Sequence, residues 1–280
     1  MPASHDAFDA ATKAARANKP VLIPGRPKLR YDWPRAWKHF RALIRNKEDT
    51  TQVFHVFESL PWKGMEAAAV QFLESPEGRA LYEAEPFLPA LLDDHAALRR
   101  MPAGSLAHAY CDFMEGEGLT AQGLVDEFET FWADRPRFDD RFTWYFDRIR
   151  DTHDFLHVLT GYGRDALGEL CVLAFTYSQQ PAPAHLFLGY AGGVELRTRI
   201  KSKAPVLRAI REGQKLGKAC PRLAELPIME LLPLPIEEAR RRLNITPARN
   251  YTQCHAEWRA LGVDPYDLIA PVEGPMAVAA

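Results

Sequence analysis

A helical repeat of large apolar side chains is the feature that most constrains the fold of this 280-residue chain. From Phe142 to Thr160, apolar and aromatic side chains return every three or four residues over about five helical turns. Other segments repeat this spacing, and they follow residues suited to cap a helix, such as Asp32, Ser105 and Thr120. The sequence has neither paired runs of alternating polarity nor an Asn-Gly hairpin signal. It therefore predicts an all-α fold, a single-domain helical bundle.

The predicted helices fill most of the chain. They are expected at residues 33–45, 50–60, 64–75, 75–86, 104–115, 120–136, 142–160, 166–178, 186–200, 205–219, 236–243 and 248–261. Thr50 or Thr51 is the expected cap of the second helix, and Asp165 caps the helix that follows the glycine-rich break at 161–163. The proline-rich stretch PIMELLPLPI is expected to be a connector.

These elements suggest three parts of the chain. Residues 1–30 are expected to be an irregular lead-in with an alanine-rich, helix-compatible piece, and residues 31–270 the helical domain. Residues 271–280 are expected to be a flexible tail. With 47% hydrophobic residues, the chain can bury a substantial core.

The charge balance limits the classes of partner, and the cysteine spacing indicates the redox state of the thiols. The chain has 35 basic and 37 acidic residues, so no overall positive field attracts nucleic acid, and no nucleic-acid partner is expected. Its four cysteines are widely spaced and form no CxxC pair, which favours reduced thiols over a disulfide scaffold.

The sequence also indicates a location. The N-terminus lacks the apolar core of a signal peptide, and it is too acidic and too poor in arginine for an organelle transit peptide. The longest apolar runs, such as Leu170–Phe175, fall far short of the roughly 20 residues that span a bilayer. A cytoplasmic protein is therefore expected, soluble or peripheral on the inner face of the membrane.

Two histidines and two acids form the strongest candidate site. His153 and His157 are four residues apart, so a helix directs both imidazoles to one side, about 6 Å apart along its axis. Asp154 lies about 100° round the same helix and could be a ligand or could orient a histidine. Glu169 lies among apolar residues of the next helix, where a buried carboxylate needs a partner. A divalent metal between two consecutive helices satisfies all four side chains.

Spacing alone leaves a second interpretation open. The histidines could instead be partly buried and hydrogen-bonded to Asp154 and Glu169 without a metal. If a metal binds, nitrogen and oxygen ligands are compatible with zinc, iron, manganese or cobalt. A zinc peptidase is disfavoured, because Asp154 would be the general base on a side chain one methylene shorter than glutamate and would have to leave the metal.

The pattern resembles a known family. HDFLH, eleven further residues and Glu169 match the HDxxH plus eleven plus E signature of the ubiquinone (coenzyme Q) biosynthesis protein four family. The likeness continues upstream at Pro102, Gly104, Ser105, Leu106, Tyr110 and Phe113. It continues downstream in YTQCHAEWRALGV and covers about residues 85–262, more loosely from residue 35.

The resemblance implies a function and a ligand set. It implies a divalent metal, most readily zinc, held by His153, Asp154, His157 and Glu169 in an all-helical protein that binds an isoprenoid chain. These residues would be catalytic in oxidative decarboxylation and hydroxylation at ring carbon one of a polyprenylated 4-hydroxybenzoate intermediate. The alternative is a non-catalytic isoprenoid-binding scaffold that organises the ubiquinone biosynthetic complex around a structural metal.

The same resemblance implies several partners. They are a polyprenyl quinone precursor or another isoprenoid lipid, other ubiquinone biosynthesis proteins and a membrane surface, and a homodimer is also a candidate assembly.

An apolar chain could approach the backbone at Gly189, Gly192 and Gly193, or these residues could simply belong to the core. A basic helical face could contact anionic headgroups or an acidic partner, or be only a solvated surface. That face comprises Arg208, Arg211, Lys215 and Lys218.

Overall fold

The computed structural model describes residues 16–46 and 49–268. Within those ranges every regular element is a helix, and β-structure is limited to one isolated bridge between Ser105 and Pro235. The α-helices are α2 (Trp33–Arg45), α3 (Thr50–Ser59), α4 (Met65–Leu73), α5 (Pro76–Ala84), α6 (Leu88–Leu92), α7 (His95–Leu98), α8 (Leu106–Glu117), α9 (Ala121–Trp132), α10 (Arg141–Asp151), α11 (His153–Thr160), α12 (Ala166–Gln179), α13 (Pro183–Arg199), α14 (Val206–Ala219), α15 (Ile228–Leu231), α16 (Ile236–Arg242) and α17 (Arg249–Ala260). Two short 3-10 helices are η1 (Leu223–Glu225) and η2 (Pro265–Leu268). The all-α prediction is confirmed.

Side-chain caps explain where several helices begin. Asp32 accepts a hydrogen bond from the Arg35 N–H at 2.9 Å, and Thr120 accepts one from the Gly123 N–H at 3.0 Å. Asp165 accepts from two amides at the start of α12. The Thr50 or Thr51 cap is wrong, since α3 begins at Thr50 after Asp49.

Several predicted boundaries differ from the structure. The helix expected over residues 142–160 is divided into α10 and α11 at Thr152, whose hydroxyl donates to the Arg148 carbonyl at 2.9 Å. Helix α13 begins at Pro183 rather than at residue 186. Helices α6 and α7 were not predicted, and α15 lies inside the expected proline-rich connector. The predicted tail and most of the alanine-rich lead-in lie outside the described residues.

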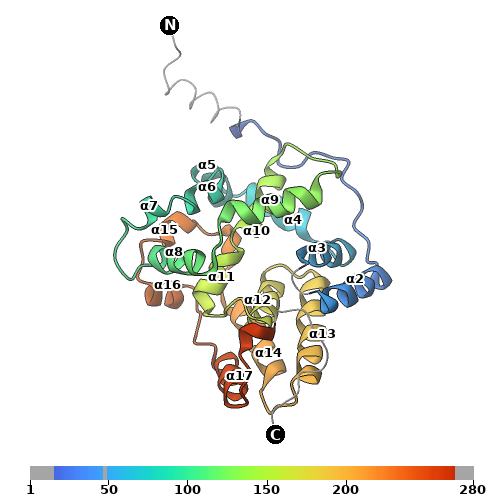
Figure 1. The fold of residues 1–280 in the computed structure, drawn as a ribbon. Coiled ribbons are helices and arrows are strands. Elements are labelled where there is room, and N and C mark those ends of the chain that lie inside the picture. The colour runs from blue at the N-terminus through green and yellow to red at the C-terminus, as the bar shows by residue number, and fades with distance from the viewer. Residues whose placement is uncertain (1–15, 47–48, 269–280) are drawn as a thin grey trace.

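Helices α12, α13 and α14 pack together beside α17, in the lower half of Figure 1. Helices α2 and α3 lie against α13, and α8 lies against α11. Two glycines let α14 approach α12 closely: a Cβ added to Gly213 would lie 2.5 Å from the Cys171 carbonyl oxygen, and one added to Gly217 would lie 2.1 Å from that of Phe175. Backbone contact between these two helices therefore requires glycine.

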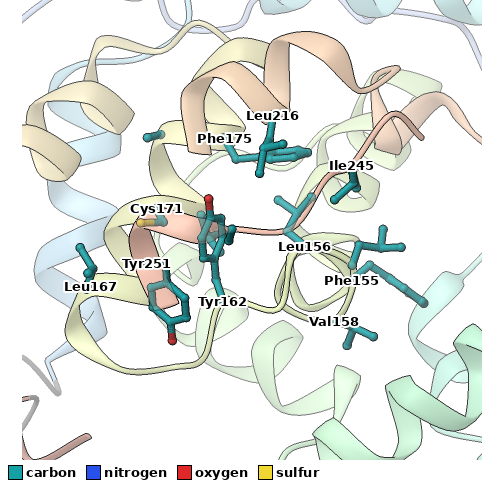
Figure 2. Packing of buried hydrophobic residues seen from close by; sticks show 14 of the residues in the cluster. Phe155, Leu156, Val158, Tyr162, Leu167, Cys171, Phe175, Leu216, Ile245 and Tyr251 are labelled. Atoms are coloured by element: carbon teal, nitrogen blue, oxygen red, sulfur yellow. The ribbon is translucent and has the colours of Figure 1, made fainter. Parts of the chain in front are cut away.

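The largest buried cluster surrounds α11 and α12. Figure 2 shows Phe155 and Leu156 from α11 in this cluster with Phe175 from α12 and Leu216 from α14. The chain leaves α11 at Gly161, whose φ of 74° is in the left-handed region. The core thus fixes both helices that carry the predicted ligands. No helix within the described ranges is long and apolar enough to cross a bilayer.

Candidate metal centre

Helix α11 brings three of the predicted ligands together. One ligand atom from each of His153, Asp154 and His157 lies within 4.8 Å of the others. The two imidazole rings have centroids 5.2 Å apart and an interplanar angle of 77°, so their edges can face one point. The convergence expected from the four-residue spacing is present.

His157 is held in an orientation that leaves one nitrogen free. Its side chain is 1% exposed, and its Nδ1 lies 3.0 Å from the carbonyl oxygen of Tyr162. A carbonyl only accepts, so Nδ1 carries the hydrogen and Nε2 carries the lone pair. The Phe113 ring stacks on the imidazole at 5.5 Å. The buried Nε2 has no hydrogen-bond partner, which is costly for a polar atom and fits a metal ligand.

Glu169 faces the histidines from α12. Its Oε2 lies 3.7 Å from His157 Nε2 and 4.0 Å from His153 Nε2, so neither pair is hydrogen-bonded. The carboxylate lies outside the compact group on α11 but across from both imidazoles. Its side chain is 37% exposed, whereas the sequence had suggested an apolar setting. The hydrogen bonds between Glu169 and the histidines that the metal-free interpretation requires are therefore absent from this arrangement.

Burial sets the protonation of the centre. Burial lowers the pKa of His157, and burial together with the neighbouring His157 imidazole lowers the pKa of His153. Both rings are therefore neutral near neutral pH, which is the form that a metal ligand requires. Burial raises the pKa of Glu169, while His153 and Arg164 oppose that change.

A network behind the centre was not predicted as functional. The Gly163 N–H, one residue after the carbonyl that binds His157, donates to the Tyr251 hydroxyl at 2.8 Å. That hydroxyl in turn donates to the Asp165 carboxylate, which is fully buried. Figure 2 shows Tyr162 and Tyr251 side by side, with ring centroids 5.1 Å apart. His255 lies beside this network, with Nε2 3.1 Å from Asp165 Oδ1 but without a hydrogen bond to it. Tyr251 and His255 belong to the YTQCHAEWR segment, which was the available signal in the sequence.

Arg164 was also not predicted as a residue of the site. Its Nε lies 3.9 Å from Glu169 Oε1, and its side chain is 40% exposed. A guanidinium therefore stands at the edge of the centre, where it can meet an anion from solvent. It precedes Asp165 in the loop that joins α11 to α12, and a lone arginine in a loop carries no sequence signal.

The remaining residues named from the sequence are the basic face of α14 and the glycines of α13. Arg208, Arg211, Lys215 and Lys218 are exposed on α14, as expected for that basic face. Gly192 and Gly193 face neighbouring side chains, because an added Cβ would lie 2.7 Å from Leu170 and 2.3 Å from Ile210 respectively. Gly192 and Gly193 therefore allow α13 to pack closely against α12 and α14.

Comparison with known proteins supports the resemblance. The family model "Coenzyme Q (ubiquinone) biosynthesis protein Coq4" matches residues 39–249. The mitochondrial ubiquinone biosynthesis protein COQ4 of Yarrowia lipolytica is 30% identical over 113 residues, which is 40% of each chain. The mitochondrial COQ4 homolog of Mus musculus is 24% identical over 183 residues, 65% of this chain and 66% of that protein. The chain thus spans between 40% and 66% of the length of these two relatives.

A solved structure supports the fold. The crystal structure of a candidate ubiquinone biosynthesis protein from Nostoc punctiforme is 23% identical. It superposes with a TM-score of 0.50 and covers 76% of this chain and 98% of its own.

Proposed function

Because the chain belongs to the coenzyme Q (ubiquinone) biosynthesis protein Coq4 family, we propose that it is a metal-dependent enzyme of ubiquinone biosynthesis. The proposed reaction removes the carboxylate at ring carbon one of a polyprenylated 4-hydroxybenzoate intermediate and introduces a hydroxyl there. It is a two-electron oxidation of the ring: water supplies the hydroxyl oxygen, dioxygen accepts two electrons and two protons and leaves as hydrogen peroxide, and the carboxylate leaves as carbon dioxide.

The observation that carries this proposal is the unpartnered Nε2 of His157. It is buried, its tautomer leaves the lone pair available, and the Glu169 carboxylate lies 3.7 Å away. His153 and Asp154 bring further nitrogen and oxygen atoms to the same point. This set suits zinc, iron, manganese or cobalt, and zinc is the metal we propose.

The chain's own groups have separate tasks in this proposal. A bound divalent cation supplies Lewis acidity for the negative charge that develops as carbon dioxide leaves. Arg164, 40% exposed beside Glu169, binds the anionic ring carboxylate and orients carbon one. Neutral His153 and His157 and the carboxylates of Asp154 and Glu169 hold the cation. The Tyr162 carbonyl keeps the His157 lone pair directed at the centre.

The primary test is the double variant His157→Ala with Glu169→Ala. Metal content by elemental analysis and turnover of a prenylated hydroxybenzoate should both be lost, while the helical circular dichroism stays near wild type. Glu83→Ala, at an exposed position on α5, is the matched control and should keep both properties. Unchanged turnover in the double variant would contradict the proposed enzymatic role.

The scaffold alternative is separated by Arg164→Ala. Arg164 is not among the proposed ligands, so metal content should remain at the wild-type value. An enzyme loses turnover in this variant, because the substrate carboxylate loses its partner. A non-catalytic scaffold with a structural metal would show no turnover even as wild type and no change in complementation in this variant, and only metal removal would lower its melting temperature.

We propose further that the partners include an isoprenoid lipid, other ubiquinone biosynthesis proteins and the inner face of a membrane. One exposed segment supports the membrane contact. Of the eight exposed large hydrophobic residues within the described ranges, four fall between positions 29 and 37. They are Leu29, Tyr31, Trp33 and Trp37. Helix α2 adds Lys38, Arg41 and Arg45 and contains no acidic residue. Interfacial tryptophans beside basic residues suit an anionic bilayer.

A further inference from the structure

A second group of ligand side chains lies between α7 and α8. His95 is the first residue of α7, and Cys111 and Glu115 lie four residues apart on one face of α8. One ligand atom from each lies within 4.8 Å of the others. The two helices contact each other and lie side by side at the left edge of Figure 1. An imidazole, a thiol and a carboxylate from two elements therefore meet at one point.

The three side chains are arranged from the interior to the surface. Cys111 is 0% exposed, the His95 side chain is 24% exposed and the Glu115 side chain is 51% exposed. The thiol therefore forms the floor of the group and the carboxylate its rim.

Neighbouring charges fix the carboxylate. The Glu115 Oε1 lies 3.0 Å from His95 Nδ1, while its Oε2 accepts from Arg99 Nη2 at 2.7 Å. Arg99 also donates to Asp112 Oδ1 at 2.6 Å through its other terminal nitrogen. The guanidinium thus occupies the far oxygen of Glu115 and leaves the near oxygen beside the imidazole and thiol.

We propose that His95, Cys111 and Glu115 form a second divalent-metal site, independent of the His153 group and specific for zinc-class ions. A thiolate is a soft ligand that favours zinc over magnesium or calcium. Three protein ligands leave the fourth tetrahedral position for water or another small ligand. The positive charges of zinc and Arg99 are balanced by the thiolate, Glu115 and Asp112, so the occupied cluster is neutral.

The geometry needs a small adjustment. Zinc bonds of about 2.0–2.3 Å place tetrahedral ligands roughly 3.3–3.8 Å apart, so ligand atoms up to 4.8 Å apart must approach by at most about 1–1.5 Å, and His95 Nδ1 and Glu115 Oε1, now 3.0 Å apart, must separate slightly. Rotation of the half-exposed Glu115 side chain and of the partly buried His95 side chain can supply these movements. The bound ion would join α7 to α8 and so fix a helix of only four residues.

The thiolate gives this site a spectroscopic signature that the His153 group lacks. The full chain is titrated with Co²⁺ and monitored for the thiolate-to-cobalt charge-transfer band in the near ultraviolet. Wild type should show the band, and elemental analysis of the zinc-loaded protein should find two ions per chain. Cys111→Ser should lose the band and one ion, and the variants His95→Ala and Glu115→Gln should weaken the band. These two side chains are more exposed than Cys111, so their variants test the site even if Cys111→Ser folds poorly.

Two control variants assign the signal. Cys220→Ser removes another buried thiol and should leave the band intact. His153→Ala with His157→Ala should lose one ion but keep the band, so failure of the proposed enzymatic centre is distinguishable from failure of this site. A wild-type protein without the band, or a band that persists in Cys111→Ser, would overturn the proposal.

Discussion

The Nδ1 atom of His157 lies 3.0 Å from the carbonyl oxygen of Tyr162, and this contact determines which imidazole nitrogen faces the candidate metal centre. The carbonyl belongs to the loop between α11 and α12, and the following amide is held by the Tyr251 hydroxyl. The orientation of the His157 imidazole on α11 therefore depends on a residue from α17, far along the chain.

Removing the Tyr251 hydroxyl should loosen that loop. In Tyr251→Phe, the Gly163 N–H and the buried Asp165 each lose a partner. We expect metal affinity to fall roughly 10- to 100-fold and the free energy of unfolding to fall by about 1–3 kcal/mol. Isothermal titration with zinc and urea unfolding measure the two effects. Tyr190→Phe, which removes a hydroxyl bound to Gln214, is the control and should leave zinc affinity unchanged. Equal zinc affinity in Tyr251→Phe and wild type would contradict this role.

The contact of α14 with α12 should not tolerate a methyl group. A Cβ at Gly217 would lie 2.1 Å from the Phe175 carbonyl oxygen, so Gly217→Ala should destabilise the fold by about 1–3 kcal/mol or more. Gly116→Ala on α8 has no heavy atom within 4 Å of the added carbon and should stabilise by about 0.5–1 kcal/mol. Thermal and urea unfolding measure both variants. If the two substitutions change stability in the same direction, the close contact of α14 with α12 does not exclude a methyl group.

Stability should fall in acid because of buried His185. Burial lowers the pKa of His185 to about 3, against an ordinary value of 6.5. Between these values the unfolded chain binds a proton and the folded chain does not, so unfolding becomes easier as the pH falls. The slope is at most about 1.4 kcal/mol per pH unit for this residue. The stability is present above pH 6.5 and is lost toward pH 3.

Urea unfolding of chelated protein at several pH values measures this effect. His185→Leu should reduce the acid slope by about one proton, and the remaining slope includes His153 and His157, whose pKa values are also lowered by burial. His108→Leu, at a half-buried position, is the control. An unchanged slope in His185→Leu would show that its neutral burial does not control acid stability.

The membrane contact should depend on α2. Trp33 and Trp37 are 51% and 52% exposed, so Trp33→Ala with Trp37→Ala should cost little stability and should reduce flotation with anionic liposomes several-fold. Arg208→Glu with Arg211→Glu on α14 tests the alternative basic face. If that second pair abolishes flotation and the tryptophan pair does not, the membrane contacts α14 instead.

Local sequence signals identified most of the helices and the three side chains of α11 that lie close enough together to hold a metal. Asp32, Thr120 and Asp165 act as caps because a cap uses only amides within three residues, and the four-residue spacing of His153 and His157 brings them together on any helix. The division at Thr152 was missed, since a threonine hydroxyl that binds the preceding turn is compatible with an unbroken helix. Short helices such as α7 were missed because four residues carry almost no periodic signal.

The sequence by itself determined the helical class, the family and the side chains that can hold a metal, because these follow from local spacing and residue type. Only the tertiary structure decided which nitrogen of His157 is free, how far Glu169 lies from it, and that Tyr251 and Asp165 hold the intervening loop. It also brought His95 to Cys111 and Glu115. These relationships join residues on different elements, and their distances are set by how helices pack rather than by their order in the chain.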